Sequence, residues 1–149
     1  MESFEDLRAR ARRSLQIAEH MITRTYPLVN DPKLILAVAD DIYTAVMSSM
    51  TAILVRKNQD FSDDFSSRFA VFQKIAPDYG FTSEDMAFIK EINNIISEHE
   101  ESPVEFARKD RFVICDNEYD CKSISLEDMK NYLFRARLFI EKAESALEK

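Results

Sequence analysis

The sequence predicts an all-α protein, an up-and-down bundle of about five helices with a small β-hairpin-like excursion before the last helix. Apolar residues recur at three- and four-residue steps over most of the chain. The 149 residues include one glycine and four prolines, too few for the frequent turns of a β-sandwich or barrel. With 46% apolar and 32% charged residues, the composition is globular and excludes intrinsic disorder.

The composition also limits the compartment and the partners. One domain, residues 1–149, is expected for this length, and the N-terminal residues have no apolar run of signal-peptide length. The longest apolar stretch, residues 34–55, is interrupted by Asp40 and Asp41, which argues against a membrane span. The net charge of −7 argues against generic nucleic-acid binding, and no double-stranded DNA partner is expected. We therefore expect a cytoplasmic protein with no membrane association.

The first two helices are predicted from their ends. Residues 4–26 form the first, with Ser3 as a suitable N-cap and acidic residues in the first turn. Pro27 is predicted to end it, because a proline pushes the preceding residue out of α geometry. Asp31 caps the second helix, residues 32–57, which begins with a proline. Two of its faces are apolar, which is typical of the central helix of a bundle.

Three more helices are predicted downstream. The third begins at Ser62 and is closed by Pro77 and Gly80. The fourth and the last each begin at a capping box, in which a hydroxyl residue and an acid three positions later satisfy each other's backbone N–H groups. The capping residues are Thr82 and Asp85 for the helix over residues 82–98, and Ser125 and Asp128 for the helix over residues 125–146.

Residues 100–124 break the helical pattern. Residues 112–115 are β-prone, and a polar turn separates them from a second short segment at 119–124. We therefore expect a small hairpin beside the bundle. Cys115 and Cys121 fit no zinc-binding spacing and are placed to face each other across this hairpin. The expected cytoplasmic location favours reduced thiols over a disulfide.

Four arginines on the first helix form the strongest charge feature of the chain. They would suit a phosphate-binding surface for RNA or a nucleotide. The commoner outcome is a solvent-exposed face paired with nearby acids, and we prefer that interpretation. The four residues are Arg8, Arg10, Arg12 and Arg13.

Arg13 and His20 are the candidate catalytic residues. Seven positions separate them, so both lie on one helix face, two turns apart. A histidine transfers protons near neutral pH, and an arginine stabilises the charge that develops on a phosphate. The pair is suitable for cleaving RNA through its 2′-hydroxyl; the alternative is an unrelated pair of surface residues.

Arg108, Lys109 and Arg111 are the candidate ligand-binding residues. They stand just before the predicted hairpin, between Phe106 and Phe112. Basic residues interleaved with aromatics are able to hold phosphate and stack a base. The commoner arrangement places the aromatics in the core and the charges in water.

Neither a metal nor a cofactor is predicted. Asp40 and Asp41 have no histidine or second carboxylate at the spacing of di-iron bundles, so we expect an arginine partner or a solvent-facing side. Glu141, Glu144 and Glu148 share a face of the last helix, which suits magnesium but is more typical of a solvated helix end. A chain with one glycine has neither a P-loop nor a dinucleotide fingerprint.

Three segments resemble the HEPN family of small archaeal and bacterial helical proteins. Residues 11–19 (ARRSLQIAE) look like its opening helix, and residues 37–54, with DDIYTA inside, are similar to its second, partner-packing helix. Residues 125–146, with RLFIEKA near their end, look like its final helix. The likeness is one of pattern, and it covers most of the chain.

The resemblance implies a helical domain that is often a homodimer. Some members are RNases that act as toxins, some pair with nucleotidyltransferases, and others have lost activity. The active members carry an arginine and, a few residues later, a histidine near the start of a late helix. Here no histidine follows His99, and Arg13 and His20 have the spacing but lie in the first helix. The resemblance therefore implies a non-catalytic relative.

From the sequence we expect a non-catalytic binding or interaction module for RNA, a nucleotide or a partner protein. A homodimer is expected, because a helix that is apolar on two sides needs cover. The first alternative is a metal-independent RNase of the HEPN type that uses Arg13 and His20. The second is a magnesium-dependent nucleotide hydrolase with a carboxylate cluster.

Overall fold

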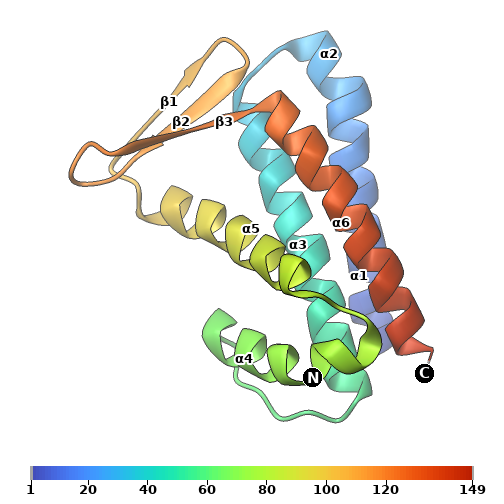
Figure 1. The fold of residues 1–149 in the computed structure, drawn as a ribbon. Helices are drawn as coiled ribbons and strands as arrows, with labels where there is room; N and C mark the ends of the chain where they lie inside the picture. The colour runs from blue at the N-terminus through green and yellow to red at the C-terminus, as the bar shows by residue number, and fades with distance from the viewer. Residues whose placement is uncertain (1, 149) are drawn as a thin grey trace.

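One long helix, α3 (Lys33–Arg56), forms the centre of the computed structural model, which describes residues 2–148. Helices α1 (Phe4–His20) and α6 (Leu126–Leu147) lie along it, and α5 (Ser83–Glu101) crosses it (Figure 1). Fourteen of its residues, from Ile35 to Leu54, are buried. The prediction that the second helix is the core of the bundle is confirmed.

The described residues are mostly helical, as predicted. Five helices have 11 residues or more: the four above and α4 (Phe65–Ile75). A pure all-α class is nevertheless too narrow, because a three-stranded antiparallel sheet precedes the last helix. The number of long helices within residues 2–148 thus agrees with the sequence, and the β part is larger than expected.

Pro27 does not end the first helical rod, contrary to the prediction. After α1, Met21–Thr25 forms a π-helical turn, and α2 (Tyr26–Val29) continues in helical geometry. The N–H of Tyr26 bonds to the carbonyl of Met21, five residues back, which makes this turn wider than an α-helical one. The shifted hydrogen bonding lets the helix continue through Pro27, which has no N–H to donate. The rod ends at Asn30, whose φ of 54° is left-handed.

Four of the five predicted capping residues or boxes accept a backbone N–H at the start of their helix. Ser3 accepts the N–H of Asp6 at 3.1 Å, Asp31 accepts that of Lys33 at 3.0 Å, and both capping boxes form. The third helix begins later than predicted, because Asp64 rather than Ser62 is its N-cap. Asp64 accepts the N–H of Ser67, whose hydroxyl in turn accepts the N–H of Ser62.

Pro77 and Gly80 close the third helical segment, as predicted. A 3₁₀ turn, Ala76–Tyr79, follows α4 and contains the proline. Gly80 ends the turn with a φ of 86°, where a residue with a Cβ would be strained.

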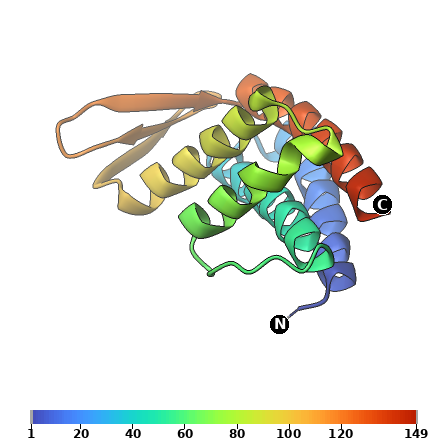
Figure 2. The same cartoon turned by 60° about the horizontal axis from the view of Figure 1, so that its bottom comes forward.

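The sheet contains β1 (Val104–Arg108), β2 (Arg111–Cys115) and β3 (Cys121–Ser125) in that order. Its inner face is buried against α3, α5 and α6, while the strands project from the side of the bundle (Figure 2). The residues of this face are Phe112, Ile114 and Ile124. The sequence predicted β2 and β3 but not β1, whose apolar residues are exposed and so lack a core pattern.

Cys115 and Cys121 form a disulfide, which corrects the expectation of reduced thiols. They are directly opposed on β2 and β3, with Cα atoms 4.0 Å apart. Antiparallel pairing therefore puts both side chains on the same face within bonding reach. The expectation of reduced thiols was wrong because it rested on the expected cytoplasmic location and gave no weight to the hairpin geometry.

An aromatic cluster fixes the end of the bundle where α4 lies. The ring of Phe81 is 5.1 Å from that of Phe72 on α4 and 5.1 Å from that of Phe139 on α6. Rings at this spacing add to the free energy of burial. The cluster thereby holds α4 in place against the rest of the bundle.

By length and hydropathy alone, α3 would be able to cross a membrane. In the structure, however, 72% of its most apolar window is buried by the rest of the chain. The central helix of a bundle passes the same length and composition test, so this is weak evidence for a span.

Candidate functional site

A groove of about 930 Å³ lies between α1, α3 and the chain that leads into α4. It combines guanidinium groups, hydroxyls and an apolar wall. The apolar part includes Leu7, Met47, Val55 and Phe61. The groove is the largest of the described hollows. It borders the chain that leads into α4, and α4 lies at the end of the bundle away from the sheet (Figure 1).

α3 supplies a row of hydroxyls to this groove. Thr44, Ser48 and Thr51 follow each other at steps of four and three residues, so they lie on one helix face. Ser48 and Thr51 are only 5% and 7% exposed. The Thr51 hydroxyl donates to the carbonyl of Met47 at 2.8 Å, which leaves its oxygen free to accept.

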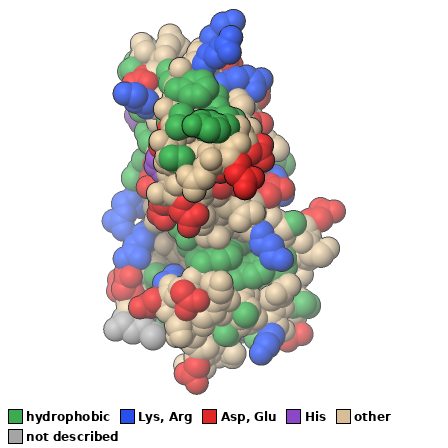
Figure 3. Space-filling view, turned by 90° about the vertical axis from the view of Figure 1, so that its left-hand side faces the viewer, with side chains coloured by type: hydrophobic (Ala, Val, Ile, Leu, Met, Phe, Trp, Pro, Cys, Tyr) green, Lys and Arg blue, Asp and Glu red, His purple; other side chains and the backbone are tan. Residues whose placement is uncertain are grey.

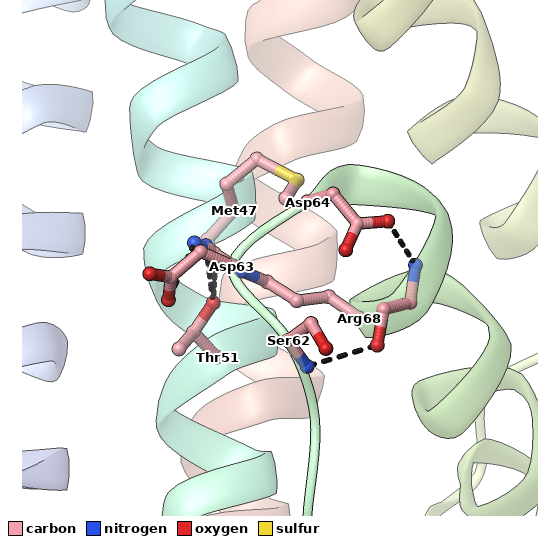
Figure 4. Close-up of polar contacts among 7 residues, drawn as sticks. Met47, Thr51, Ser62, Asp63, Asp64 and Arg68 are labelled. Atoms are coloured by element: carbon pink, nitrogen blue, oxygen red, sulfur yellow. Dashed lines mark hydrogen bonds and ion pairs between the residues drawn. The ribbon is translucent and has the colours of Figure 1, made fainter.

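Arg68 reaches from α4 to Thr51, the last residue of this row (Figure 4). Its Nη1 donates to the Thr51 hydroxyl at 3.2 Å, and its Nη2 is 3.9 Å from a carboxylate oxygen of Asp63. Asp63 is fully exposed, so that ion pair contributes little. The Nε of Arg68 is buried and has no hydrogen-bond partner among the described residues. Arg68 therefore keeps unused donor capacity, which is costly in a folded protein without a ligand.

Arg10 of α1 supplies the second guanidinium of the groove. It forms an ion pair with Glu2, and both side chains are close to half exposed. An exposed pair of this kind is weak and is easily replaced by a ligand. Two arginines, one from each wall, are thus available to an anion in the groove.

Tyr43 adds a phenol to the same wall. Burial raises the pKa of Tyr43, and the positive charge of Arg68 acts in the opposite direction. With the pKa above its ordinary value, the phenol is protonated at neutral pH and is a hydrogen-bond donor.

The four arginines of α1 divide between two environments. Arg8 and Arg12 both bind Glu144 of α6, at 2.5 and 2.9 Å. Partial burial acts to raise the pKa of Glu144, but the hydrogen bonds from Arg8 and Arg12 outweigh it and hold the pKa below its ordinary value. The preferred interpretation, pairing with acids, therefore holds for these two residues. It also holds for Arg10, whose partner Glu2 lies with it in the groove.

Arg13 and His20 lie on α1, and both are exposed. Seven residues of helix separate them by about 10 Å along the axis. Two shallow hollows lie beside His20, and Arg13 lines neither. Their proposed joint role in RNA cleavage stays a prediction.

Arg108, Lys109 and Arg111 come together at the turn between β1 and β2, at the opposite end of α3 from the groove (Figure 1). All three are exposed. Of the two flanking aromatics, Phe112 is buried in the core, whereas Phe106 is 47% exposed. One aromatic thus faces the core, as in the commoner arrangement, and the other stays beside the charges. Ligand binding by Arg108, Lys109 and Arg111 stays a prediction.

The acidic residues singled out in the sequence do not converge. Asp40 is exposed and Asp41 is half-buried. Burial, followed by the charge of Asp40, raises the pKa of Asp41. Glu144 is bound by arginines, and the described residues contain no group of three acids, histidines or cysteines able to hold a metal ion.

The residues that build the groove were not identified from the sequence, with the exception of Arg10. A signal was present in α3, where Thr44, Ser48 and Thr51 place hydroxyls at helical spacing in an otherwise apolar segment. Arg68 gave no signal, because its reach depends on how the loop before α4 turns back toward α3.

No protein-family model matches this sequence, and no curated protein matches it significantly.

Proposed function

We propose that this chain is a non-catalytic binding module that holds a phosphorylated small molecule of the mononucleotide class in the groove between α1, α3 and α4. The observation that carries the proposal is Arg68, a largely buried guanidinium with an unpartnered Nε in a groove of about 930 Å³. A phosphate in the groove would bind the exposed part of this guanidinium, because guanidinium groups bind phosphate through charge-assisted hydrogen bonds.

The rest of the lining suits the rest of such a ligand. Arg10 provides a second cation for the phosphate, and the hydroxyls of Thr44 and Ser48 provide neutral donors. Phe61 and Tyr43 provide aromatic rings on which a base can stack. One groove thus offers both the polar and the apolar contacts that small-molecule sites combine.

The lining favours binding over chemistry. The described part of it contains neither histidine nor cysteine, the side chains that most readily transfer a proton or attack near neutral pH. Its acids are Glu2, Asp6 and Asp63, of which the first and last form the surface pairs with the two arginines. Asp6 is therefore the one carboxylate of the described lining that is outside these pairs.

Calorimetric titration tests the proposal. The ligands are AMP, UMP, inorganic phosphate and unphosphorylated adenosine, and the variants are Arg68→Gln and Arg10→Gln. Arg137→Gln is the matched control, because Arg137 forms a similar half-exposed pair with Glu19 outside the groove. We expect a mononucleotide to bind, adenosine not to bind, and Arg68→Gln to weaken binding at least tenfold. Absence of binding by every phosphorylated ligand, or equal weakening by Arg137→Gln, contradicts the proposal.

The kinship with HEPN domains, the homodimer and the cytoplasmic location belong to the same proposal. The exposed Phe134 and Leu138 on the outer side of α6 support a partner surface. Size-exclusion chromatography with light scattering tests the dimer, and a monomer at all concentrations contradicts it. The magnesium-dependent hydrolase has less support, because Glu144 of its carboxylate cluster is engaged by Arg8 and Arg12.

A further inference from the structure

The sheet presents an outer face that the groove does not use. Side chains alternate along a strand, so the residues that face away from the buried Phe112 and Ile114 share one surface. This outer face consists of Val104, Phe106 and Arg108 on β1 and of Arg111 and Val113 on β2. Phe106 is 47% exposed and Val104 41% exposed. Figure 3, which views the side where the sheet lies, shows basic side chains at the top and hydrophobic ones directly below them.

The charges at the end of this face lack partners. Arg108 and Arg111 are directly opposed across the two strands, and like charges in that position destabilise a sheet. Arg111 donates only to the Ser123 hydroxyl, at 3.3 Å. Arg108, Lys109 and Arg111 form no ion pair within residues 2–148. Asp110 lies in the same turn, but it forms no ion pair with these three side chains within residues 2–148, so the cluster remains available to an external anion.

β1 is also a free edge. The strand order in the described residues places β2 on one side of β1 and nothing on the other. Every second residue of β1 therefore directs its N–H and C=O away from the sheet. Glu105 is bound by the Nδ1 of His99 at 2.5 Å, which fastens β1 to the end of α5. The edge is thus held in extended form before any partner arrives.

We propose that this edge and outer face bind an extended acidic peptide segment of a partner protein, which adds a fourth strand beside β1. Backbone groups of the peptide would pair with the free edge, and its acidic side chains would lie beside Arg108 and Arg111. Apolar side chains two and four residues away from the acid that faces Arg108 would lie against Phe106 and Val104, respectively.

The composition of the face favours a peptide over a nucleic acid. Val104 and Val113 have no flat ring on which a base can stack, so Phe106 is the only stacking platform of the outer face. The net charge of −7 opposes the approach of a long polyanion, whereas a short peptide with two acids meets mainly the local cluster. A free strand edge also offers hydrogen bonds that a peptide backbone matches directly.

The test uses the full chain and a synthetic seven-residue peptide, Val-Thr-Val-Thr-Glu-Thr-Glu, blocked at both ends. Nuclear magnetic resonance follows amide shifts and hydrogen exchange in β1. We expect the peptide to bind and to slow exchange at those amides of residues 104–108 that point away from β2. Replacement of its two Glu by Lys, or N-methylation of alternate backbone nitrogens, should abolish this protection. The double variant R108E/R111E should weaken binding at least fivefold, whereas the control R13E/R24E, with the same charge change on exposed residues, should not.

Three outcomes overturn the proposal. The first is no slowing of exchange in β1 at millimolar peptide. The second is tighter binding of an oligouridylate than of the acidic peptide, with the same dependence on Arg108 and Arg111, which assigns the face to single-stranded nucleic acid. The third is protection of β1 that grows with protein concentration without peptide, which assigns the edge to a second copy of the chain. None of these three results depends on the groove, which lies at the other end of α3.

Discussion

Arg68 of α4 donates a hydrogen bond from Nη1 to the hydroxyl of Thr51 on α3, 3.2 Å away. The same Thr51 hydroxyl donates a hydrogen bond to the backbone carbonyl of Met47 in its own helix. A chain of two hydrogen bonds therefore connects α4 to the buried centre of the bundle across the groove. The position of the Arg68 guanidinium depends on this connection.

Replacement of Thr51 by valine removes the hydroxyl and keeps the shape of the side chain. We expect the free energy of unfolding to fall by about 1–2 kcal/mol, because Arg68 loses an acceptor in a part-buried site. Urea unfolding followed by circular dichroism measures the change. Thr23→Val is the matched control, since Thr23 makes the same bond to the carbonyl four residues back but is exposed and does not contact Arg68. An equal loss in both variants would show that Arg68 is irrelevant to the effect.

Glu144→Gln should destabilise the protein in a pH-dependent way. The pKa of Glu144 is lowered in the folded state, so its carboxylate contributes stability above the unfolded-state pKa, and that contribution is lost as the pH falls through the folded-state pKa. We expect Glu144→Gln to lower the free energy of unfolding by about 1 kcal/mol near pH 7, with the difference shrinking toward zero in acid. Unfolding midpoints between pH 7 and pH 3 provide the measurement. A difference that is constant with pH refutes the assignment to the Arg8 and Arg12 ion pairs.

Asp41→Asn should stabilise the protein at neutral pH, which is the opposite of the effect of Glu144→Gln. The pKa of Asp41 is raised by burial and by the neighbouring Asp40, so the charged form is disfavoured in the folded state. Its ionisation therefore costs stability at neutral pH, and the cost disappears below the unfolded-state pKa. We expect Asp41→Asn to raise the thermal midpoint at pH 7 and to leave it unchanged in strong acid. Asp40→Asn, at an exposed neighbour, serves as the control, and a gain as large as that of Asp41→Asn would argue for simple relief of repulsion.

RNA degradation in the presence of a chelator separates the binding module from the RNase alternative. We expect the purified chain to leave a labelled single-stranded RNA intact, because Arg13 and His20 share no hollow with each other. His20→Ala should behave in the same way. Cleavage by the unaltered chain that is lost in His20→Ala would instead establish the RNase and replace the present proposal.

The regular helices were predictable because their signals are local. A capping box is complete within four residues, as at Thr82 and Asp85, and each formed as predicted. Pro27 was misjudged because one π-helical turn upstream removes the need for its N–H, and no residue in Met21–Thr25 marks such a turn in advance. β1 was missed for a related reason, since its apolar residues face outward and the pattern of a core strand is absent.

The groove was harder to predict than the fold. It unites Arg10, Thr51 and Arg68 from three separate elements, and the distance between such residues is set by packing and by the path of a loop. The run of basic residues in the sequence gave only partial guidance. Arg8 and Arg12 pair with Glu144, more than a hundred positions away, whereas Arg10, between them, pairs with the nearby Glu2. Partners so remote in sequence leave no spacing to recognise.

The sulfur–sulfur bond between Cys115 and Cys121 closes a small ring around residues 116–120, all of which are exposed. A protease that cuts once inside this ring would leave two pieces that still migrate as one band on a gel, until a reducing agent lets them separate. Comparison of gels run with and without a reducing agent after one such cut would thus show whether Cys115 and Cys121 are bonded in the cell, with no need to label either cysteine.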